Sequence, residues 1–191
     1  VSPEEIITGN GSNEIIDIAA KTFLMPEDSA VMARPSFVVY RSATLMAGAR
    51  PVEIPLTHDA RHDLMAMAEA VKENTRIVFI ANPNNPTGTI NRRDEFEAFI
   101  KKVPSHVVIV VDEAYHEYVT DREYPDTLQY LKKGYPLIIL RTFSKIYGLA
   151  GLRIGYGIGP VELIAEMNRI REPFNVNTLA QLAALGALKD R

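Results

Sequence analysis

The sequence of 191 residues contains no cysteine, so the chain can form neither disulfides nor thiolate metal sites. It also has no excess of positive charge, because 21 Lys and Arg residues face 24 Asp and Glu residues, and the basic residues are scattered rather than clustered. No apolar run approaches the roughly 18 residues that span a bilayer, and the N-terminus has no signal-peptide pattern. These absences predict a cytoplasmic protein without nucleic-acid or membrane partners.

The length sets the number of domains. A chain of 191 residues with 47% hydrophobic content can build one domain with its own core, but not two large ones. The sequence begins with Val1 rather than methionine and stops at Arg191, directly after an apolar helical stretch. We therefore expect a fragment of a longer protein.

Apolar runs of strand length alternate with helical patterns along the chain. The expected strands cover residues 30–33, 51–55, 76–81, 107–111, 137–140 and 152–158. The expected helices cover residues 12–24, 37–47, 64–72, 92–103, 161–171 and 178–188. This alternation predicts a three-layer α/β domain, in which helices cover both faces of a mostly parallel sheet.

Three polar segments directly follow expected strands, at residues 82–88, 112–115 and 142–145. In open α/β sheets, ligands bind beyond the carboxyl ends of the strands. We therefore expect these three loops to converge on one edge of the sheet and to form a ligand site there.

The segment Thr142-Phe143-Ser144-Lys145, with Arg153 eight residues further on, gathers two hydroxyls, an amine and a guanidinium. Lysine forms Schiff bases with carbonyl compounds, and this set suits a phosphorylated aldehyde. A surface lysine after a strand is the simpler interpretation, and the spacing alone favours it.

The segment Gly11-Ser12-Asn13 opens the first expected helix. Free N–H groups and the helix dipole at such a start can bind a phosphate, although an ordinary helix cap gives the same pattern. Asp112 ends a wholly apolar strand, where a carboxylate loses hydration and needs a cationic partner. A protonated pyridine nitrogen would serve, and a salt bridge to an arginine or a loop cap are the alternatives.

Asn85 and Tyr115 could both reach a ring hydroxyl, and Phe37 could stack on a flat ring. Each also has a structural interpretation, as a loop-fixing amide, a half-buried tyrosine and a core residue. The glycines of residues 155–159 do not fit a dinucleotide fingerprint and are expected to serve close packing or a turn. No histidine shows metal-ligand spacing.

Taken in order, these motifs resemble those of a known family. Gly-Ser-Asn, Pro-Ser-Phe, Asn-Pro-Asn-Asn-Pro-Thr-Gly, Val-Asp-Glu-Ala-Tyr, Thr-Phe-Ser-Lys and Arg153 follow one another as in the fold-type I pyridoxal-phosphate aminotransferases of class I/II. The resemblance covers essentially the whole chain. It is closest to the histidinol-phosphate aminotransferase branch, for which residues 171–177 are a weaker cue.

The resemblance implies roles for each residue. Lys145 would bind pyridoxal 5'-phosphate covalently and then move a proton, Asp112 would pair with the pyridine nitrogen, and Asn85 and Tyr115 would bond the ring hydroxyl. Phe37 occupies the position of the stacking aromatic, where relatives often have tyrosine. The residues implied to bind the phosphate are Ser12, Asn13, Thr142, Ser144 and Arg153, and Gly11 is a further implied cofactor-binding residue.

The same resemblance implies a function. The parent enzyme would transfer an amino group from L-histidinol phosphate to 2-oxoglutarate, as a homodimer in histidine biosynthesis. Aromatic-amino-acid aminotransferase and threonine-phosphate decarboxylase are alternatives on the same fold, and a non-catalytic α/β binding domain is the alternative of a different class. Residues 1–191 would be the cofactor-binding large domain. The N-terminal arm, the C-terminal small domain with its carboxylate-binding arginine, and the partner's tyrosine have no counterpart in this sequence.

Overall fold

A computed structural model describes residues 1–190, which form a seven-stranded sheet in the order β1-β7-β6-β5-β4-β2-β3. The strands are β1 (Ile6–Gly9), β2 (Ser29–Arg34), β3 (Arg50–Pro55), β4 (Thr75–Ala81), β5 (Val108–Asp112), β6 (Leu137–Thr142) and β7 (Gly155–Ile158). The pairs from β3 through β6 are parallel, whereas β7 runs antiparallel to both β6 and β1. The expectation of a mostly parallel sheet is confirmed.

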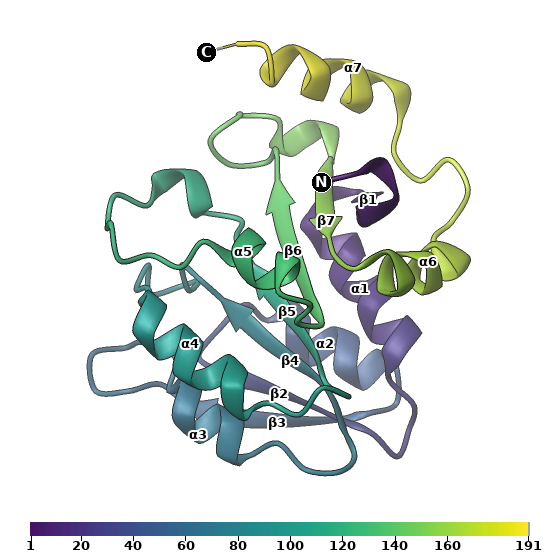
Figure 1. The fold of residues 1–191 in the computed structure, drawn as a ribbon. Helices are drawn as coiled ribbons and strands as arrows, with labels where there is room; N and C mark the ends of the chain where they lie inside the picture. Colours follow the sequence, from purple (N-terminus) through teal and green to yellow (C-terminus); the bar gives the residue numbers. More distant parts are fainter. Residues whose placement is uncertain (191) are drawn as a thin grey trace.

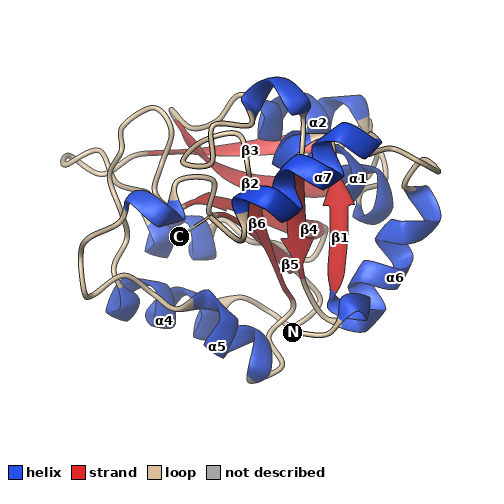
Figure 2. Ribbon diagram, turned by 90° about the horizontal axis from the view of Figure 1, so that it is seen from above, coloured by secondary structure: helices blue, strands red, loops and turns tan. Residues whose placement is uncertain are grey.

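Helices cover both faces of this sheet, which makes three layers (Figures 1 and 2). The helices are α1 (Gly11–Phe23), α2 (Val39–Met46), α3 (Leu64–Glu69), α4 (Arg93–Lys102), α5 (Thr127–Lys132), α6 (Val161–Ile170) and α7 (Thr178–Ala187). Buried side chains of α1, α2 and α6 form the core on one face, and those of α3, α4 and α5 form the core on the other.

The position of β5 between the two helical layers explains why residues 108–111 are all apolar. Val108 and Val110 belong to the core cluster under α1, α2 and α6, whereas Ile109 and Val111 belong to the cluster under α3, α4 and α5. Successive side chains on a strand point to opposite faces, so a central strand between two helical layers needs an apolar residue at every position. Burial of each side chain contributes about 1.5–3 kcal/mol relative to exposure.

Several elements differ from the sequence-based expectation. Strand β1 and helix α5 were not predicted, because neither is long enough to show a clear period. The helix predicted from residue 37 begins at Val39, so Phe37 belongs to the loop before it. The strand predicted from residue 152 begins at Gly155, because Ala150–Leu152 form a 3-10 turn.

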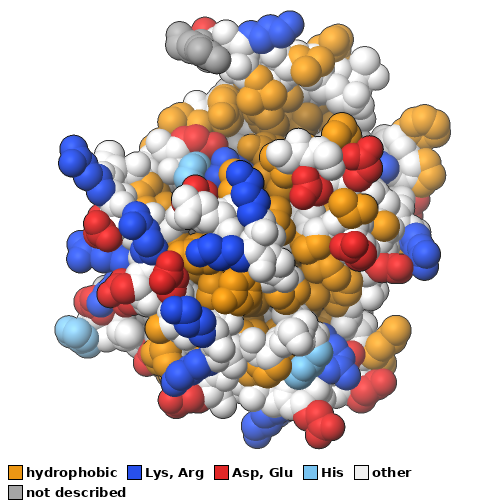
Figure 3. Space-filling view, in the orientation of Figure 1, with side chains coloured by type: hydrophobic (Ala, Val, Ile, Leu, Met, Phe, Trp, Pro, Cys, Tyr) orange, Lys and Arg blue, Asp and Glu red, His pale blue; other side chains and the backbone are white. Residues whose placement is uncertain are grey.

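Helix α7 lies beyond the end of the sheet, and hydrophobic side chains gather on the surface around it (Figures 1 and 3). It packs through Ala180 and Ala184 against a small cluster around Phe143, while Leu179, Leu182 and Leu185 are exposed. Among residues 1–190, no helix has both the length and the apolar character needed to cross a membrane.

The start of α1 rests directly on strand β7, and Gly155 makes this contact possible. A Cβ atom at Gly155 would lie 2.5 Å from the Ser12 backbone nitrogen and 2.7 Å from the Gly11 carbonyl carbon. Close packing, as expected for the glycines of residues 155–159, is therefore confirmed at this position. The absence of a side chain at residue 155 fixes where the first turn of α1 can lie.

We predict that Gly155→Ala destabilises the protein by about 1–3 kcal/mol, because the added methyl meets backbone atoms that cannot rotate away. Urea unfolding measures the change. Gly186→Ala is the matched control, since a Cβ at Gly186 in α7 meets nothing within 4 Å. Alanine in a helix interior should stabilise by about 0.5–1 kcal/mol. Equal free energies of unfolding for the two variants would contradict the close contact.

Candidate active site

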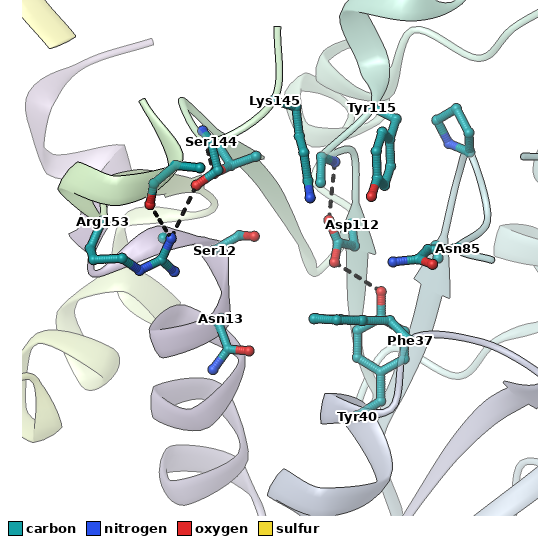
Figure 4. A pocket seen from close by; sticks show the side chains of 16 residues that line it. Ser12, Asn13, Phe37, Tyr40, Asn85, Asp112, Tyr115, Ser144, Lys145 and Arg153 are labelled. Carbon is teal, nitrogen blue, oxygen red and sulfur yellow. Dashed lines mark hydrogen bonds between the residues drawn. The ribbon is translucent and has the colours of Figure 1, made fainter. Parts of the chain in front are cut away.

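A cavity of about 190 Å³ lies at the carboxyl ends of β4, β5 and β6, beside the start of α1 (Figure 4). The structure brings all the residues predicted from sequence into this one cavity, so the three loops converge as expected. Those lining residues are Gly11, Ser12, Asn13, Phe37, Asn85, Asp112, Tyr115, Thr142, Ser144, Lys145 and Arg153. Their individual roles stay predictions.

Asp112 is 6% exposed at the end of β5. Its Oδ2 accepts a hydrogen bond from the Tyr40 hydroxyl (2.9 Å), and its Oδ1 accepts one from the Ala114 backbone nitrogen (3.1 Å). Burial raises the pKa of the Asp112 carboxyl, and these two hydrogen bonds offset that only in part. Among the described residues no arginine pairs with Asp112, so the salt-bridge alternative is wrong. The carboxylate can therefore serve a cationic ligand atom.

The arginine of this region pairs with the next residue instead. Glu113 is fully buried, and its carboxylate accepts hydrogen bonds from Thr127 Oγ1 (2.6 Å) and from Arg141 Nε (3.0 Å) and Nη2 (2.9 Å). Burial raises the pKa of Glu113, and Arg141 opposes the shift. Asp112 bonds Tyr40 of α2 and Glu113 bonds Thr127 of α5, and these helices cover opposite faces of the sheet, so the two acids do not share a ligand. Nowhere in residues 1–190 do three or more possible metal ligands gather.

Tyr40 is a cavity residue that sequence reasoning missed. Its ring is buried, stacks on Phe79 at a centroid distance of 5.0 Å and meets the edge of Phe37 at 5.7 Å. The sequence did contain a signal for Tyr40. Tyr40 stands three positions after Phe37, and in a helical turn this spacing places two aromatic rings on the same side. The stack fixes the hydroxyl that bonds Asp112, and so orients the carboxylate.

Lys145 follows β6 in a tight turn and extends into the cavity (Figure 4). The turn is held by the Thr142 hydroxyl, which accepts a hydrogen bond from the Ser144 backbone nitrogen (3.1 Å). The Lys145 ammonium nitrogen lies 5.1 Å from the centroid of the Tyr115 ring. Within the described part of the chain, no carboxylate forms an ion pair with this amine. The amine is thus held by an aromatic ring rather than neutralised by an acid.

The opposite side of the cavity gathers Ser12, Asn13, Ser144 and Arg153 (Figure 4). Gly11 has a φ of +73°, and the helix that it opens presents its first-turn N–H groups beside the Ser12 hydroxyl. Arg153 donates to the Asn10 carbonyl (3.2 Å) and the Ala150 carbonyl (2.8 Å), and lies 3.4 Å from Ser144 Oγ. A helix start together with a fixed guanidinium is a typical phosphate-binding arrangement.

A hydrogen-bond network of Asn10, Glu14 and Asn175 stabilises the start of α1, next to this side of the cavity. Glu14 Oε2 accepts from the Asn10 backbone nitrogen (2.6 Å) and from Asn175 Nδ2 (2.7 Å). Asn10 Nδ2 in turn donates to the Asn175 carbonyl (2.7 Å). The segment 171–177, which served only as a family cue in the sequence, therefore supports the start of α1.

The fold and the cavity define a class of protein: an α/β domain with a buried carboxylate, a lysine amine and an anion-binding helix start at the carboxyl edge of its sheet. The model of the family "Aminotransferase class I and II" matches residues 1–191. The chain belongs to this family, and the resemblance seen in its motifs is confirmed.

Several relatives of similar sequence or structure are histidinol-phosphate aminotransferases. The histidinol-phosphate aminotransferase of Caldicellulosiruptor saccharolyticus is 52% identical, over 100% of this chain and 53% of its own length. That of Brevibacillus brevis is 53% identical, over 100% and 52% respectively. The crystal structure of the Sinorhizobium meliloti enzyme in complex with pyridoxal-5'-phosphate matches with a TM-score of 0.93 and 31% identity, over 100% of this chain and 51% of that chain. The chain spans about half the length of these relatives.

We predict that Asp112→Asn stabilises the ligand-free protein at pH 7, by on the order of 1 kcal/mol, because it removes a buried charge. Asparagine can still accept from Ala114 and can donate to the Tyr40 oxygen. Since the folded pKa of Asp112 is raised, the wild type loses stability as pH rises above the ordinary aspartate value of 3.8. The advantage of the variant should therefore vanish below that pH.

Urea unfolding between pH 3 and pH 7 tests this difference. The exposed Asp94 gives the matched control, since Asp94→Asn should change stability by less than about 0.5 kcal/mol at any pH. A destabilised Asp112→Asn protein at pH 7 would show that the carboxylate is not strained by its burial.

Proposed function

We propose that this chain is the cofactor-binding domain of a pyridoxal-phosphate-dependent aminotransferase, whose full-length form acts on L-histidinol phosphate and 2-oxoglutarate. The observation that carries the proposal is the meeting, in one cavity, of an amine, a buried carboxylate without a cation and a preformed anion site. The names of the relatives, histidinol-phosphate aminotransferases at 52% and 53% identity, support the choice of substrate.

The donor set fits each part of the cofactor. The first turn of α1, with Ser12 and Asn13, and the groups of Ser144 and Arg153 would hold the phosphate. Arg153 needs no rearrangement for this role, because Asn10 and Ala150 already fix its guanidinium. A phosphate bound there would satisfy the free N–H groups at the helix start.

The other residues would hold the ring. Phe37 offers an aromatic face, and Asn85 and Tyr115 offer an amide and a phenol to the ring hydroxyl. Asp112 would face the pyridine nitrogen. Its buried carboxylate is stabilised by a cation, so it favours the protonated form of that nitrogen. Pyridoxal phosphate, when bound, supplies an electron sink for the negative charge that develops at the substrate α-carbon.

Lys145 would carry two functions. Its amine would bond the cofactor carbonyl carbon and, once released, accept and return the proton of the substrate α-carbon. The Tyr115 ring beside it attracts the ammonium form and keeps the side chain in the cavity. Proton transfer therefore depends on one flexible side chain held against a rigid ring.

Recognition of the substrate carboxylate needs a further group. Among the residues that line the cavity in the described chain, Arg153 is the sole arginine, and it is engaged with Asn10 and Ala150. The family resemblance implies an arginine from a small C-terminal domain and residues from a partner subunit. We therefore expect the full-length protein to be a homodimer with a second domain, and light scattering that finds only active monomer would contradict this.

We predict that borohydride reduction of the protein with pyridoxal phosphate attaches a pyridoxyl group to Lys145, detected by peptide mapping. Lys145→Ala should lose the adduct and the visible absorbance of the bound cofactor while remaining folded. Lys133→Ala is the matched control, because Lys133 also lies over a tyrosine ring, at 5.3 Å from the centroid of Tyr130, but outside the cavity. An unlabelled Lys145 with the cofactor in excess would favour a non-catalytic binding domain.

The substrate can be tested with the full-length protein in single-turnover experiments. We expect L-histidinol phosphate to convert the bound cofactor at least about tenfold faster than L-phenylalanine or L-threonine phosphate, since a site that bonds a substrate group discriminates strongly against analogues without it. Absorbance changes of the cofactor give the rates. A silent reaction with L-histidinol phosphate would reject this substrate while leaving the cofactor assignment intact.

A further inference from the structure

The side chain of Asn84 is 3% exposed and connects two of the loops that line the cavity. These loops contain residues 35–37 and residues 82–91. Asn84 Nδ2 donates to the Pro35 carbonyl (3.3 Å) and to Thr87 Oγ1 (2.9 Å). Asn84 Oδ1 accepts from Ser36 Oγ (2.9 Å) and from His62 Nε2 (3.0 Å). All the bonding capacity of this amide is thus used to connect neighbouring segments.

The partners of Asn84 fix the protonation of His62. The Pro35 carbonyl can only accept, so the amide nitrogen of Asn84 must face it and the amide oxygen must face His62. His62 Nε2 therefore carries a proton and donates. His62 is 2% exposed, and among the described residues its Nδ1 has no hydrogen-bond partner. Burial lowers the pKa of His62 to about 4, so the ring is neutral at pH 7.

The backbone around His62 is fastened to the same loop. Asn91 Nδ2 donates to the His62 carbonyl (2.9 Å), and Thr89 Oγ1 donates to the Ala60 carbonyl (2.6 Å). Asn91 and Asn82 bond each other reciprocally at 3.0 Å and close the base of the loop 82–91. The position of the His62 imidazole is therefore fixed, and its hydrogen bond to Asn84 restrains that amide.

Neither residue serves the cavity directly, because the lining includes neither His62 nor Asn84. Their neighbours do line it: Phe37 follows Ser36, and Asn85 follows Asn84. A buried imidazole with one unpartnered nitrogen stabilises a fold less than an apolar side chain that fills the same space. The hydrogen bonds between two polar side chains do fix direction and spacing, which apolar contacts leave free.

We propose that His62 and Asn84 are positioning residues that set the spacing between Phe37 and Asn85, and so preform the slot into which the flat cofactor ring fits. This inference rests on the proposed function. It assigns a role in cofactor binding to two residues that do not line the cavity. A flat ring binds most tightly when the groups on its face and at its edge are already in place.

His62→Ala tests the proposal in the ligand-free and the loaded protein. We expect the affinity for pyridoxal phosphate to fall about tenfold, the effect of losing one or two hydrogen bonds that order a binding loop. The pH midpoint of the visible absorbance of the bound cofactor should shift, because Asn85 would bond the ring hydroxyl. In the ligand-free protein, amide hydrogen exchange should become faster in residues 36–37 and in the non-proline residues of 82–91. His62→Gln places an amide N–H near the position of Nε2–H and should restore most of the affinity.

The matched control is Thr75→Val. Thr75 is the first residue of β4, at the end of the strand opposite to the cavity. Thr75 is buried, and its hydroxyl accepts from the Lys72 backbone nitrogen (2.9 Å) and bonds Ser29 Oγ (3.1 Å). This variant should lower stability but leave the affinity, the pH midpoint and the exchange of both loops unchanged. Should His62→Ala be too unstable to purify, Ser36→Ala is the substitute, because it removes the bond to Asn84 (2.9 Å) and a longer contact with His62 Nε2 (3.4 Å) but keeps the bond between His62 and Asn84. It should change the same three quantities in the same direction, by about threefold in affinity.

The outcomes separate the two proposals. A wild type that does not bind pyridoxal phosphate would reject the proposed function alone, because the exchange of the two loops can still be compared in the ligand-free variants. Loop exchange in His62→Ala that matches the wild type and Thr75→Val would overturn the positioning role, whether or not the cofactor binds.

Discussion

The rest of the site depends on the burial of one carboxylate. Asp112 lies at the end of a strand that both helical layers cover, and its hydrogen bonds come from Tyr40 and Ala114 rather than from a cation. A charge in that position costs free energy, which the apolar core of the sheet must offset. The fold thus holds a hydrogen-bonded carboxylate at the cavity without an ion pair among the described residues, which is the state that the role proposed for Asp112 requires.

The neighbouring Glu113 is also buried, but it has the cationic partner that Asp112 lacks within residues 1–190. Asp112 is the last residue of β5 and Glu113 follows it, and both are buried, yet Arg141 and Thr127 bond only Glu113. Glu113 faces the helical layer of α5, where it forms an ion pair, whereas Asp112 faces the layer of α2 and lines the cavity. Two adjacent acids therefore differ in their partners because of the faces on which they lie, not because of their chemistry.

The sequence alone could predict the alternating layers, the apolar central strand and the three loops that meet at the cavity, since these follow from periodicity and from the order of strands. It could not predict contacts between distant residues. Tyr40 bonds Asp112 across 72 positions, His62 bonds Asn84 across 22, and Asn175 bonds Glu14 across 161. Such pairs leave no periodic signal, and β1 and α5 are too short to leave a clear one.

The contact of Gly155 with the start of α1 has a consequence for how the chain acquires its site. The anion-binding corner joins residues 11–13 to residues 144 and 153, and among residues 1–190 strand β1 pairs only with β7. During synthesis β1 is made before β7, and it has no partner strand within the described residues until β7 leaves the ribosome. Such distant pairing forms slowly, because a long loop must close before its contacts can form. The anion-binding corner is therefore completed late in the synthesis of this chain, although residues 11–13 are made well before residues 144 and 153.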